Sequence, residues 1–190
     1  MYNLVAHDPY HDVNLQDDTS RWAKKHAYYK PNDYGIRRSK HIQNNHFLFT
    51  FVRNPYDRVL SAYLDKITQP HKQRKIAEHL QKPLDSNITF EDFIKYLNRG
   101  GLYGNIHWAP QSSFLLPKEY YGFIGYVETL NQDLQYLLSH IFPNVSSYNF
   151  EKETKNITHA HNKREIYYSA ELMRQVRRLY WMDFEHLGYD

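Results

Sequence analysis

The feature that most constrains the fold is a short apolar run that ends at a helix-start signal. Residues 47–52 are almost wholly apolar and rich in aromatic and β-branched side chains, which is typical of a strand buried on both faces of a parallel sheet. The run stops at Arg53, and Asn54-Pro55 then combines a good N-cap residue with the residue favoured at the first helical position. We therefore predict a strand that passes directly into a helix reaching about Ile67.

Further patterns extend this start into an alternating order of strands and helices. Thr89 is a predicted N-cap, because apolar residues follow it at helical spacing as far as Leu97. Residues 121–127 indicate a second buried strand, whose glycines allow a neighbour to approach closely. Leucines and an isoleucine form one stripe over 130–141, and Ser169 caps a last helix that stops near Gly188. This order predicts an α/β fold, with a mainly parallel sheet flanked by helices.

Length and composition narrow the class of protein. A chain of 190 residues is the usual size of one domain, so we predict a single domain over 1–190. Residues 1–45 are predicted to be irregular, with at most one short helix at 21–29, and organisation begins at residue 46. Lys and Arg outnumber Asp and Glu only 24 to 21, too small and too scattered an excess to indicate nucleic-acid binding. The sequence contains no cysteine, which excludes a disulfide framework and a thiolate metal site.

One segment combines the features of an anion site. Arg53 lies at the carboxyl end of the first predicted strand, where open α/β sheets bind ligands, and the helix that follows begins at the same place. Asn54, Arg58 and Ser61 fall at helical spacing on one face. A guanidinium donates two hydrogen bonds to one phosphate, so this combination suits a phosphate group. The alternative is that Arg53 and Arg58 only satisfy loop carbonyls and acidic neighbours.

Four segments of the sequence, in order, form a recognisable set: Arg53-Asn-Pro-Tyr-Asp-Arg-Val-Leu-Ser-Ala-Tyr63, His107-Trp-Ala-Pro-Gln111, Ile124-Gly-Tyr-Val-Glu-Thr-Leu130 and Asp183-Phe-Glu-His-Leu-Gly-Tyr189. Together they resemble the Golgi-type carbohydrate sulfotransferases and their bacterial relatives. The first is similar to the family's 3′-phosphate-binding motif, the second to its His-Trp-x-Pro-Gln segment, the third to its Ile-Gly-x-x-Glu-x-Leu segment, and the fourth to its C-terminal close. The resemblance covers roughly residues 46–190 and implies a three-layer, P-loop-like sulfotransferase fold.

The resemblance also implies a donor and a reaction. These enzymes transfer a sulfuryl group from 3′-phosphoadenosine-5′-phosphosulfate (PAPS) to a carbohydrate hydroxyl and release 3′,5′-adenosine bisphosphate. Carried onto this sequence, the resemblance implies that Arg53 and Ser61 hold the 3′-phosphate of the donor, with Arg58 in support. Lys163 and Arg164 could close over the phosphates of the donor or belong to a solvated loop.

Two residues are candidates for acid–base chemistry. His107 could be the general base for the acceptor hydroxyl, because an imidazole titrates near neutral pH, or it could be structural beside Trp108. Glu128 follows the second strand and could orient a base or a sugar hydroxyl, or it could cap the next helix. No metal site is predicted, because none of the 12 histidines has the carboxylate spacing of a ligand motif.

One family signature is missing from the sequence. The 5′-phosphosulfate loop, of the Pro-Lys-x-x-x-Thr type, should lie on a strand-to-helix turn before the 3′-phosphate motif, and no segment matches it. The expectation is that the chain begins after this loop, so that the first strand, loop and helix of the fold are absent. Three explanations for the missing loop remain open: the chain is a shortened one, it is a natural remnant that binds nucleotide or glycan without turnover, or another lysine takes the place of the loop lysine. No stretch of the sequence has the length and apolar character of a membrane span, and none has the pattern of a signal peptide. We therefore expect a cytoplasmic location, or a Golgi membrane if a segment precedes Met1.

Overall fold

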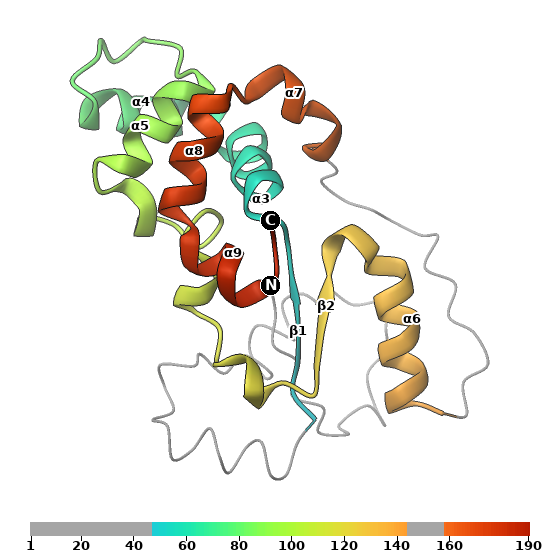
Figure 1. The fold of residues 1–190 in the computed structure, drawn as a ribbon. Coiled ribbons are helices and arrows are strands. Elements are labelled where there is room, and N and C mark those ends of the chain that lie inside the picture. The colour runs from blue at the N-terminus through green and yellow to red at the C-terminus, as the bar shows by residue number, and fades with distance from the viewer. Residues whose placement is uncertain (1–46, 144–157) are drawn as a thin grey trace, which may run out of the picture. The chain divides into compact units, whose positions relative to one another are not determined.

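The computed structural model of the protein describes residues 47–143 and 158–190 (Figure 1). These residues belong to two compact units: residues 47–52 and 114–143 in the first, and residues 53–113 and 158–190 in the second. The predicted irregular region over 1–45 and its helix at 21–29 lie outside the described residues. The single domain stays a prediction.

The first unit contains a parallel pair of strands. Strands β1 (Phe49–Val52) and β2 (Phe123–Tyr126) lie side by side, with Phe49 opposite Phe123 (Figure 1). Both predicted strands are therefore confirmed, each a little shorter than expected. The close approach expected at the β2 glycine is also confirmed, because a Cβ on Gly125 would lie 2.4 Å from the ring of Phe51.

The prediction that β1 is buried on both faces is wrong. Thr50 and Val52 are buried, whereas Phe49 and Phe51 are partly exposed. Successive side chains of a strand point to opposite faces, so this alternation means that one face of β1 is more open than the other. The sequence did not predict this difference, because apolar residues occupy both faces of the run.

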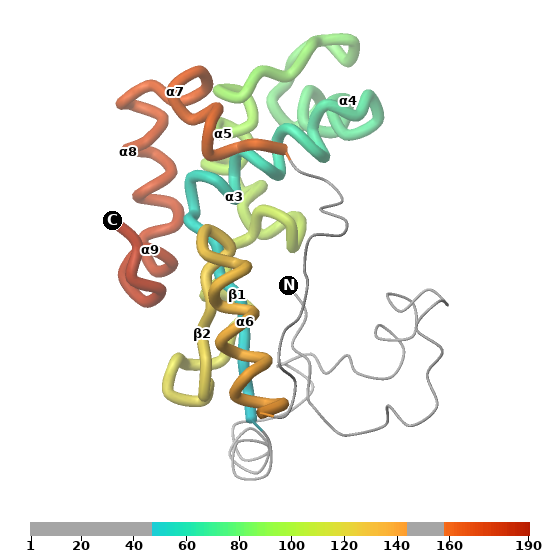
Figure 2. Tube along the Cα trace, turned by 90° about the vertical axis from the view of Figure 1, so that its right-hand side faces the viewer, coloured from blue at the N-terminus to red at the C-terminus, as the bar shows by residue number. Residues whose placement is uncertain are grey.

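Helix α6 (Leu130–Ile141) packs beside strand β2 in the first unit. It contacts β2 and runs alongside that strand (Figure 2). The predicted apolar stripe supplies this contact, and Leu137 is buried by it. The carboxylate of Asp133 accepts from Tyr126 N at 2.6 Å and from the Thr129 hydroxyl at 2.9 Å, which fixes the turn between β2 and the helix.

The second unit is built around helix α3 (Pro55–Ala62). The Asn54 side chain accepts from Tyr56 N, and proline occupies the first turn, as the sequence predicts. The helix continues through a π-helix over Tyr63–Ile67, so the predicted end near Ile67 is confirmed. A further helix, α4 (Pro70–His79), was not predicted.

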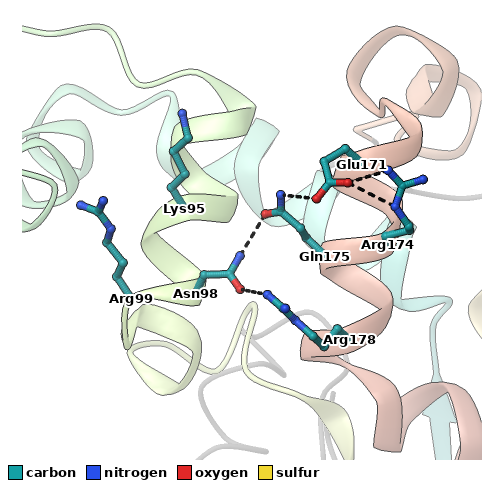
Figure 3. Close-up of a pocket in the computed structure, with 7 residues that line it drawn as sticks. All are labelled: Lys95, Asn98, Arg99, Glu171, Arg174, Gln175 and Arg178. Atoms are coloured by element: carbon teal, nitrogen blue, oxygen red, sulfur yellow. Dashed lines mark hydrogen bonds and ion pairs between the residues drawn. The ribbon is translucent and has the colours of Figure 1, made fainter.

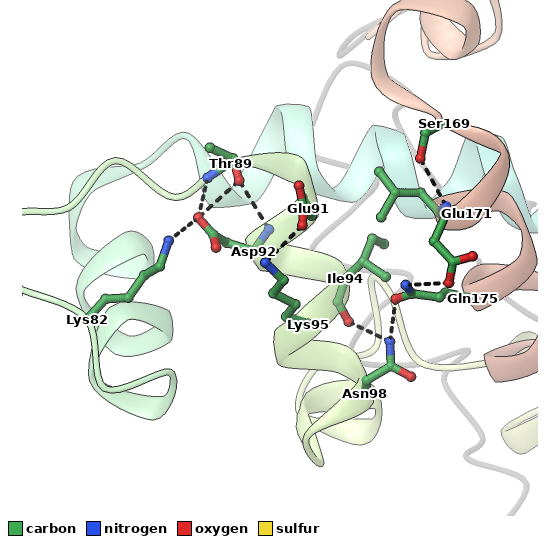
Figure 4. A network of polar contacts seen from close by, with 11 residues as sticks. Lys82, Thr89, Glu91, Asp92, Ile94, Lys95, Asn98, Ser169, Glu171 and Gln175 are labelled. Carbon is green, nitrogen blue, oxygen red and sulfur yellow. Dashed lines mark hydrogen bonds and ion pairs between the residues drawn. The ribbon is translucent and has the colours of Figure 1, made fainter.

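Helix α5 (Phe90–Asn98) has a strongly capped N-terminus. Thr89 Oγ1 accepts from Asp92 N at 3.1 Å, and the Asp92 carboxylate accepts from Thr89 N at 3.2 Å, which completes a capping box (Figure 4). Lys82 Nζ lies 2.6 Å from the same carboxylate. Desolvation raises the pKa of Asp92, but the bonds from Lys82 and Thr89 outweigh it and lower the pKa below its usual value.

The last predicted helix is two helices in the structure. Helix α8 (Ala170–Leu179) begins at the predicted Ser169 cap, and α9 (Trp181–Leu187) ends at Gly188 with φ +74°. A separate short helix, α7 (Arg164–Tyr167), precedes them. The break between α8 and α9 lies at Tyr180, whose backbone is not helical and whose side chain is buried. The hydroxyl of Tyr180 donates to the carbonyl of Trp108 at 2.5 Å, which holds the residue at the break.

The helices of the second unit share one apolar core. Helix α8 contacts both α3 and α5, and Figure 1 shows α8 lying beside both of these helices. Aromatic and aliphatic side chains fill the space between them, among them Val59, Leu60, Phe93, Leu97 and Val176. With a parallel strand pair and packed helices, the chain has the predicted α/β class.

Candidate functional site

The main chain of Arg53 is held by the side chain of Gln111. Gln111 Oε1 accepts from Arg53 N at 2.9 Å, and Gln111 Nε2 donates to Arg53 O at 2.8 Å. Gln111 is itself fully buried, with no exposed surface. An amide that bonds both polar groups of one residue fixes that residue as a β-strand neighbour would, so the start of α3 is held in one conformation.

The carboxylate of Asp183 in turn holds Gln111. Asp183 is fully buried, and its two oxygens accept from Gln111 N at 2.7 Å and from Ser112 N at 2.8 Å. A carboxylate that accepts two main-chain N–H groups makes strong, charge-assisted bonds. Asp183, Gln111 and Arg53 therefore form a continuous chain of contacts from α9 to the residue before α3, and they belong to three of the four segments that carry the family resemblance.

Arg58 is bonded to the loop that carries His107. Its Nη1 donates to Ala109 O at 2.6 Å and its Nη2 donates to Ile106 O at 2.5 Å. Burial lowers the pKa of Arg58 from its ordinary value, although the charge of Asp183 acts in the opposite direction. The contact of a guanidinium with loop carbonyls was the alternative drawn from the sequence, and it makes Arg58 a residue that positions the loop.

Ser61 has a hydroxyl neighbour that the sequence did not reveal. Thr158 Oγ1 donates to Ser61 Oγ at 2.9 Å, and Ser61 is partly buried. The three residues predicted to share one face of α3 thus have different partners: Asn54 caps its own helix, Arg58 holds the loop, and Ser61 bonds Thr158. The pair of hydroxyls is a hydrogen-bonding group suited to phosphate oxygens.

Arg164 is fixed on α3 by a buried carboxylate. Asp57 is 2% exposed, and its oxygens lie 2.5 Å from Arg164 Nε and 3.3 Å from His161 Nδ1. The guanidinium of Arg164 also lies over the ring of Tyr56, 5.7 Å from the centroid, in cation–π geometry. Arg164 thus lies on α7 with its side chain bonded to α3, whereas Lys163 lies partly buried in the 3₁₀ turn His161–Lys163 before it.

The two candidates for acid–base chemistry belong to different units. His107 is exposed in the second unit, where desolvation and the positive charge of Lys66 lower the pKa of its imidazole. A lowered pKa keeps the ring neutral, and so able to accept a proton, at a more acidic pH than usual. Glu128 is exposed in the 3₁₀ turn Val127–Thr129 of the first unit, where Asp133 bonds the turn before α6.

The second unit therefore brings together most of the residues that the sequence singled out. Arg53, Arg58, Ser61 and Arg164 all lie on α3, immediately before it, or in direct contact with it. Three contributors were missed: Gln111 and Asp183 were named only as members of motifs, and no role for Thr158 was predicted from the sequence. The motif spacing was the signal that could have identified Gln111 and Asp183.

A comparison with known protein families shows to which family the chain belongs. The model of the "Sulfotransferase family" matches residues 5–190. The chain belongs to the sulfotransferase family. The resemblance drawn from four segments is confirmed, and the match reaches further towards the N-terminus than those segments do. No solved structure matches this sulfotransferase-family chain.

Curated relatives support the same family. Carbohydrate sulfotransferase 11 of Mus musculus is 29% identical over 182 residues, which cover 83% of this chain and 51% of the relative. Carbohydrate sulfotransferase 10 of Rattus norvegicus is 31% identical over 178 residues, which cover 76% of this chain and 47% of the relative. The chain thus spans about half the length of the curated relatives it matches. Among the described residues, no helix has the length and apolar character needed to cross a membrane; the cytoplasmic location stays a prediction.

Proposed function

We propose that this chain carries the donor-binding part of a sulfotransferase that uses PAPS and acts on a carbohydrate hydroxyl. The observation that carries the proposal is the bonding of Gln111 to both main-chain polar groups of Arg53, with Asp183 fixing Gln111. A binding arginine is effective when its position is fixed before the ligand arrives, because less conformational entropy is then lost on binding. The relatives' names support the carbohydrate acceptor.

The residues at the start of α3 fit the 3′-phosphate of this donor. A phosphate needs positive charge and several hydrogen-bond donors, and Arg53 supplies a guanidinium beside a helix N-terminus, where the helix dipole favours an anion. Ser61 supplies a hydroxyl about two turns further along the chain, with the Thr158 hydroxyl as its neighbour. We assign Arg53 and Ser61 to direct contact with the phosphate, and Arg164 and Lys163 to the edge of the site.

Arg58 and His107 have different proposed roles. Arg58 orients the loop over residues 106–109 and stays bonded to its carbonyls. His107 on that loop is the proposed base, because its lowered pKa leaves a neutral nitrogen to take the proton of the acceptor hydroxyl. When bound, the donor supplies its sulfuryl group to the hydroxyl oxygen, and the bond from sulfur to the phosphate oxygen breaks as 3′,5′-adenosine bisphosphate leaves. The role of Glu128, orienting a base or a sugar hydroxyl, stays a prediction from the sequence.

The test is calorimetric titration of 3′,5′-adenosine bisphosphate into the 190-residue chain and its Arg53→Ala variant. Loss of a charge-assisted, two-bond contact should weaken binding roughly 30- to 100-fold. Arg74→Ala is the matched control, because Arg74 is exposed on α4, and it should bind as the unaltered chain does. Equal binding by Arg53→Ala and the unaltered chain, or no binding by either, would overturn the proposal.

A further inference from the structure

A polar groove lies between α5 and α8, apart from the residues assigned to the donor. It encloses about 570 Å³ and is lined entirely by charged and amide side chains (Figure 3): Lys95, Asn98 and Arg99 from α5, and Glu171, Arg174, Gln175 and Arg178 from α8. The lining has no apolar or aromatic side chain, which makes it unsuited to a hydrophobic ligand or a stacked base.

A chain of hydrogen bonds joins the two helices that line the groove. Asn98 Nδ2 donates to Gln175 Oε1 at 3.1 Å, and Arg178 Nη2 donates to Asn98 Oδ1 at 3.3 Å. Gln175 Nε2 donates to Glu171 Oε1 at 3.0 Å, so three residues of α8 and one of α5 are held together (Figure 3). Asn98 also donates to Ile94 O at 3.1 Å. The two helices that line the groove are therefore bonded to each other.

The groove has an excess of positive charge. Four cationic side chains line it against one carboxylate. That carboxylate, Glu171, is bonded to Arg174 at 2.6 Å, and the bonds from Gln175 and Arg174 lower its pKa. Lys95 is paired with Glu91 at 2.9 Å. Within residues 47–143 and 158–190, neither Arg99 nor Arg178 forms an ion pair, and both are exposed.

The charges are spaced along the groove and not gathered at one point. Lys95 on α5 and Arg99 at its C-cap are one helical turn apart, as are Arg174 and Arg178 on α8, so the backbone positions of successive cations lie about 6 Å apart along each helix axis. A linear anion with repeated charges could contact several of them in turn, whereas a single small anion could not. Charge complementarity and the polar lining together favour a chain of acidic sugars.

We infer that the α5–α8 groove binds a carboxylate- or sulfate-bearing stretch of polysaccharide. The choice of a saccharide rests on the proposed function, because a sulfotransferase acting on glycans meets such chains at its surface; the anionic character rests on the groove alone. Arg99 and Arg178 bind the anionic groups, while Asn98 and Gln175 keep the two helices in register. The groove thus holds a part of the glycan other than the hydroxyl that reacts.

The test compares binding of a fluorescent heparin-derived hexasaccharide to the full chain and to two double variants. Arg99→Gln/Arg178→Gln removes both guanidiniums of the groove that form no ion pair, and roughly tenfold weaker binding is expected, since each exposed contact has a modest strength. Arg74→Gln/Lys75→Gln is the matched control, because it removes two exposed charges from α4 and should change affinity less than twofold. Equal weakening in both double variants would mean a general charge effect and would overturn the inference.

Three more ligands test the chemical class of the occupant. A desulfated, carboxyl-reduced hexasaccharide should not bind; equal binding would refute the anionic character of the ligand. A thymidine oligonucleotide that binds more tightly than the hexasaccharide, or inorganic sulfate that competes at an equal concentration of charge, would also count against a polysaccharide site.

Thermal unfolding of the same variants tests whether the cations have only a structural role. If they serve only to stabilise helix ends, the groove variant will lower the melting temperature while its affinity stays unchanged, which would overturn the inference. Lys95→Gln/Arg99→Gln, confined to α5, repeats the binding test if the first variant fails to fold.

Failure of this inference is distinguishable from failure of the proposed function. Binding of 3′,5′-adenosine bisphosphate, measured on the same samples, should be equal in the groove variant and the unaltered chain. Loss of hexasaccharide binding with intact nucleotide binding supports the groove. Loss of both in the groove variant contradicts its separation from the donor site.

Discussion

Replacement of Gln111 by methionine tests whether the buried amide positions Arg53. Methionine has a similar length and volume but forms neither bond, so the main-chain N–H and carbonyl of Arg53 lose their partners at 2.9 and 2.8 Å. Each lost hydrogen bond costs about 1 kcal/mol net, and each polar group left without water costs more, up to about 3 kcal/mol. Because Arg53 is only partly buried, water can reach it, and we expect a total loss of about 2–4 kcal/mol.

The assay has two readouts. Thermal unfolding should show a melting temperature lower by about 5–15 °C, since 1 kcal/mol corresponds to about 2–4 °C in a chain of this length. Titration with 3′,5′-adenosine bisphosphate, at a temperature where the variant is folded, should show affinity reduced about tenfold, because Arg53 is no longer held in its binding position. Gln73→Met on α4 is the control; Gln73 is partly buried on a helix away from Arg53, and both readouts should change little.

A double variant separates positioning from stability. Arg53→Ala keeps the main-chain groups that Gln111 bonds, so adding Gln111→Met to it should cost nearly the same stability as in the unaltered chain. The affinity should fall little further, because the guanidinium that Gln111 positions is already gone. The argument from geometry is wrong if Gln111→Met leaves stability and affinity unchanged. It is also wrong if, in the double variant, the loss of affinity from Gln111→Met simply adds to the loss from Arg53→Ala.

Three further predictions follow from other contacts. Asp92→Asn should destabilise the chain by about 1–3 kcal/mol at pH 7 in urea unfolding. Because the folded state lowers the pKa of Asp92, the difference in stability between this variant and the unaltered chain should shrink as the pH falls below about 4. A difference that stays constant with pH would exclude the Lys82 ion pair as its cause. Gly101→Ala should lower the melting temperature, because the new Cβ would lie 2.3 Å from the ring of Tyr96, and an unchanged value would show that the ring moves freely. The acid limb of the transfer rate should lie below pH 6.5, since the pKa of His107 is lowered, and it should vanish in His107→Gln; a limb above pH 6.5 would assign the base elsewhere.

The elements that the sequence predicted well are those with a local signal. Asn54-Pro55 marks the start of α3, Thr89 caps α5, and Ser169 caps α8, because an N-cap is chosen by the residues immediately around it. The two strands were found from composition alone. The break at Tyr180 was not, since the apolar pattern continues through it and only the bond from its hydroxyl to Trp108 O, 72 residues away, explains it.

The site was predicted in part for the same reason. Arg53 and Ser61 lie in one local motif, whereas the partners that hold them come from distant segments. Thr158 is 97 residues from Ser61, and Arg164 is 107 residues from Asp57, so no spacing rule connects them. The sequence could name the chemical groups of the candidate site, but the contacts that orient them depend on how α3, α7 and α9 pack.

The bond between Asp183 and Gln111 has a consequence for the synthesis of the protein. Asp183 emerges from the ribosome 72 residues after Gln111, an interval of about 4–14 s at 5–20 residues per second. During that interval α3 can form, but Gln111 lacks the carboxylate that fixes its main chain. With the proposed nucleotide site, the nascent chain should therefore bind nucleotide only after α9 has been translated. Nucleotide affinity would then report the moment at which Asp183 bonds Gln111.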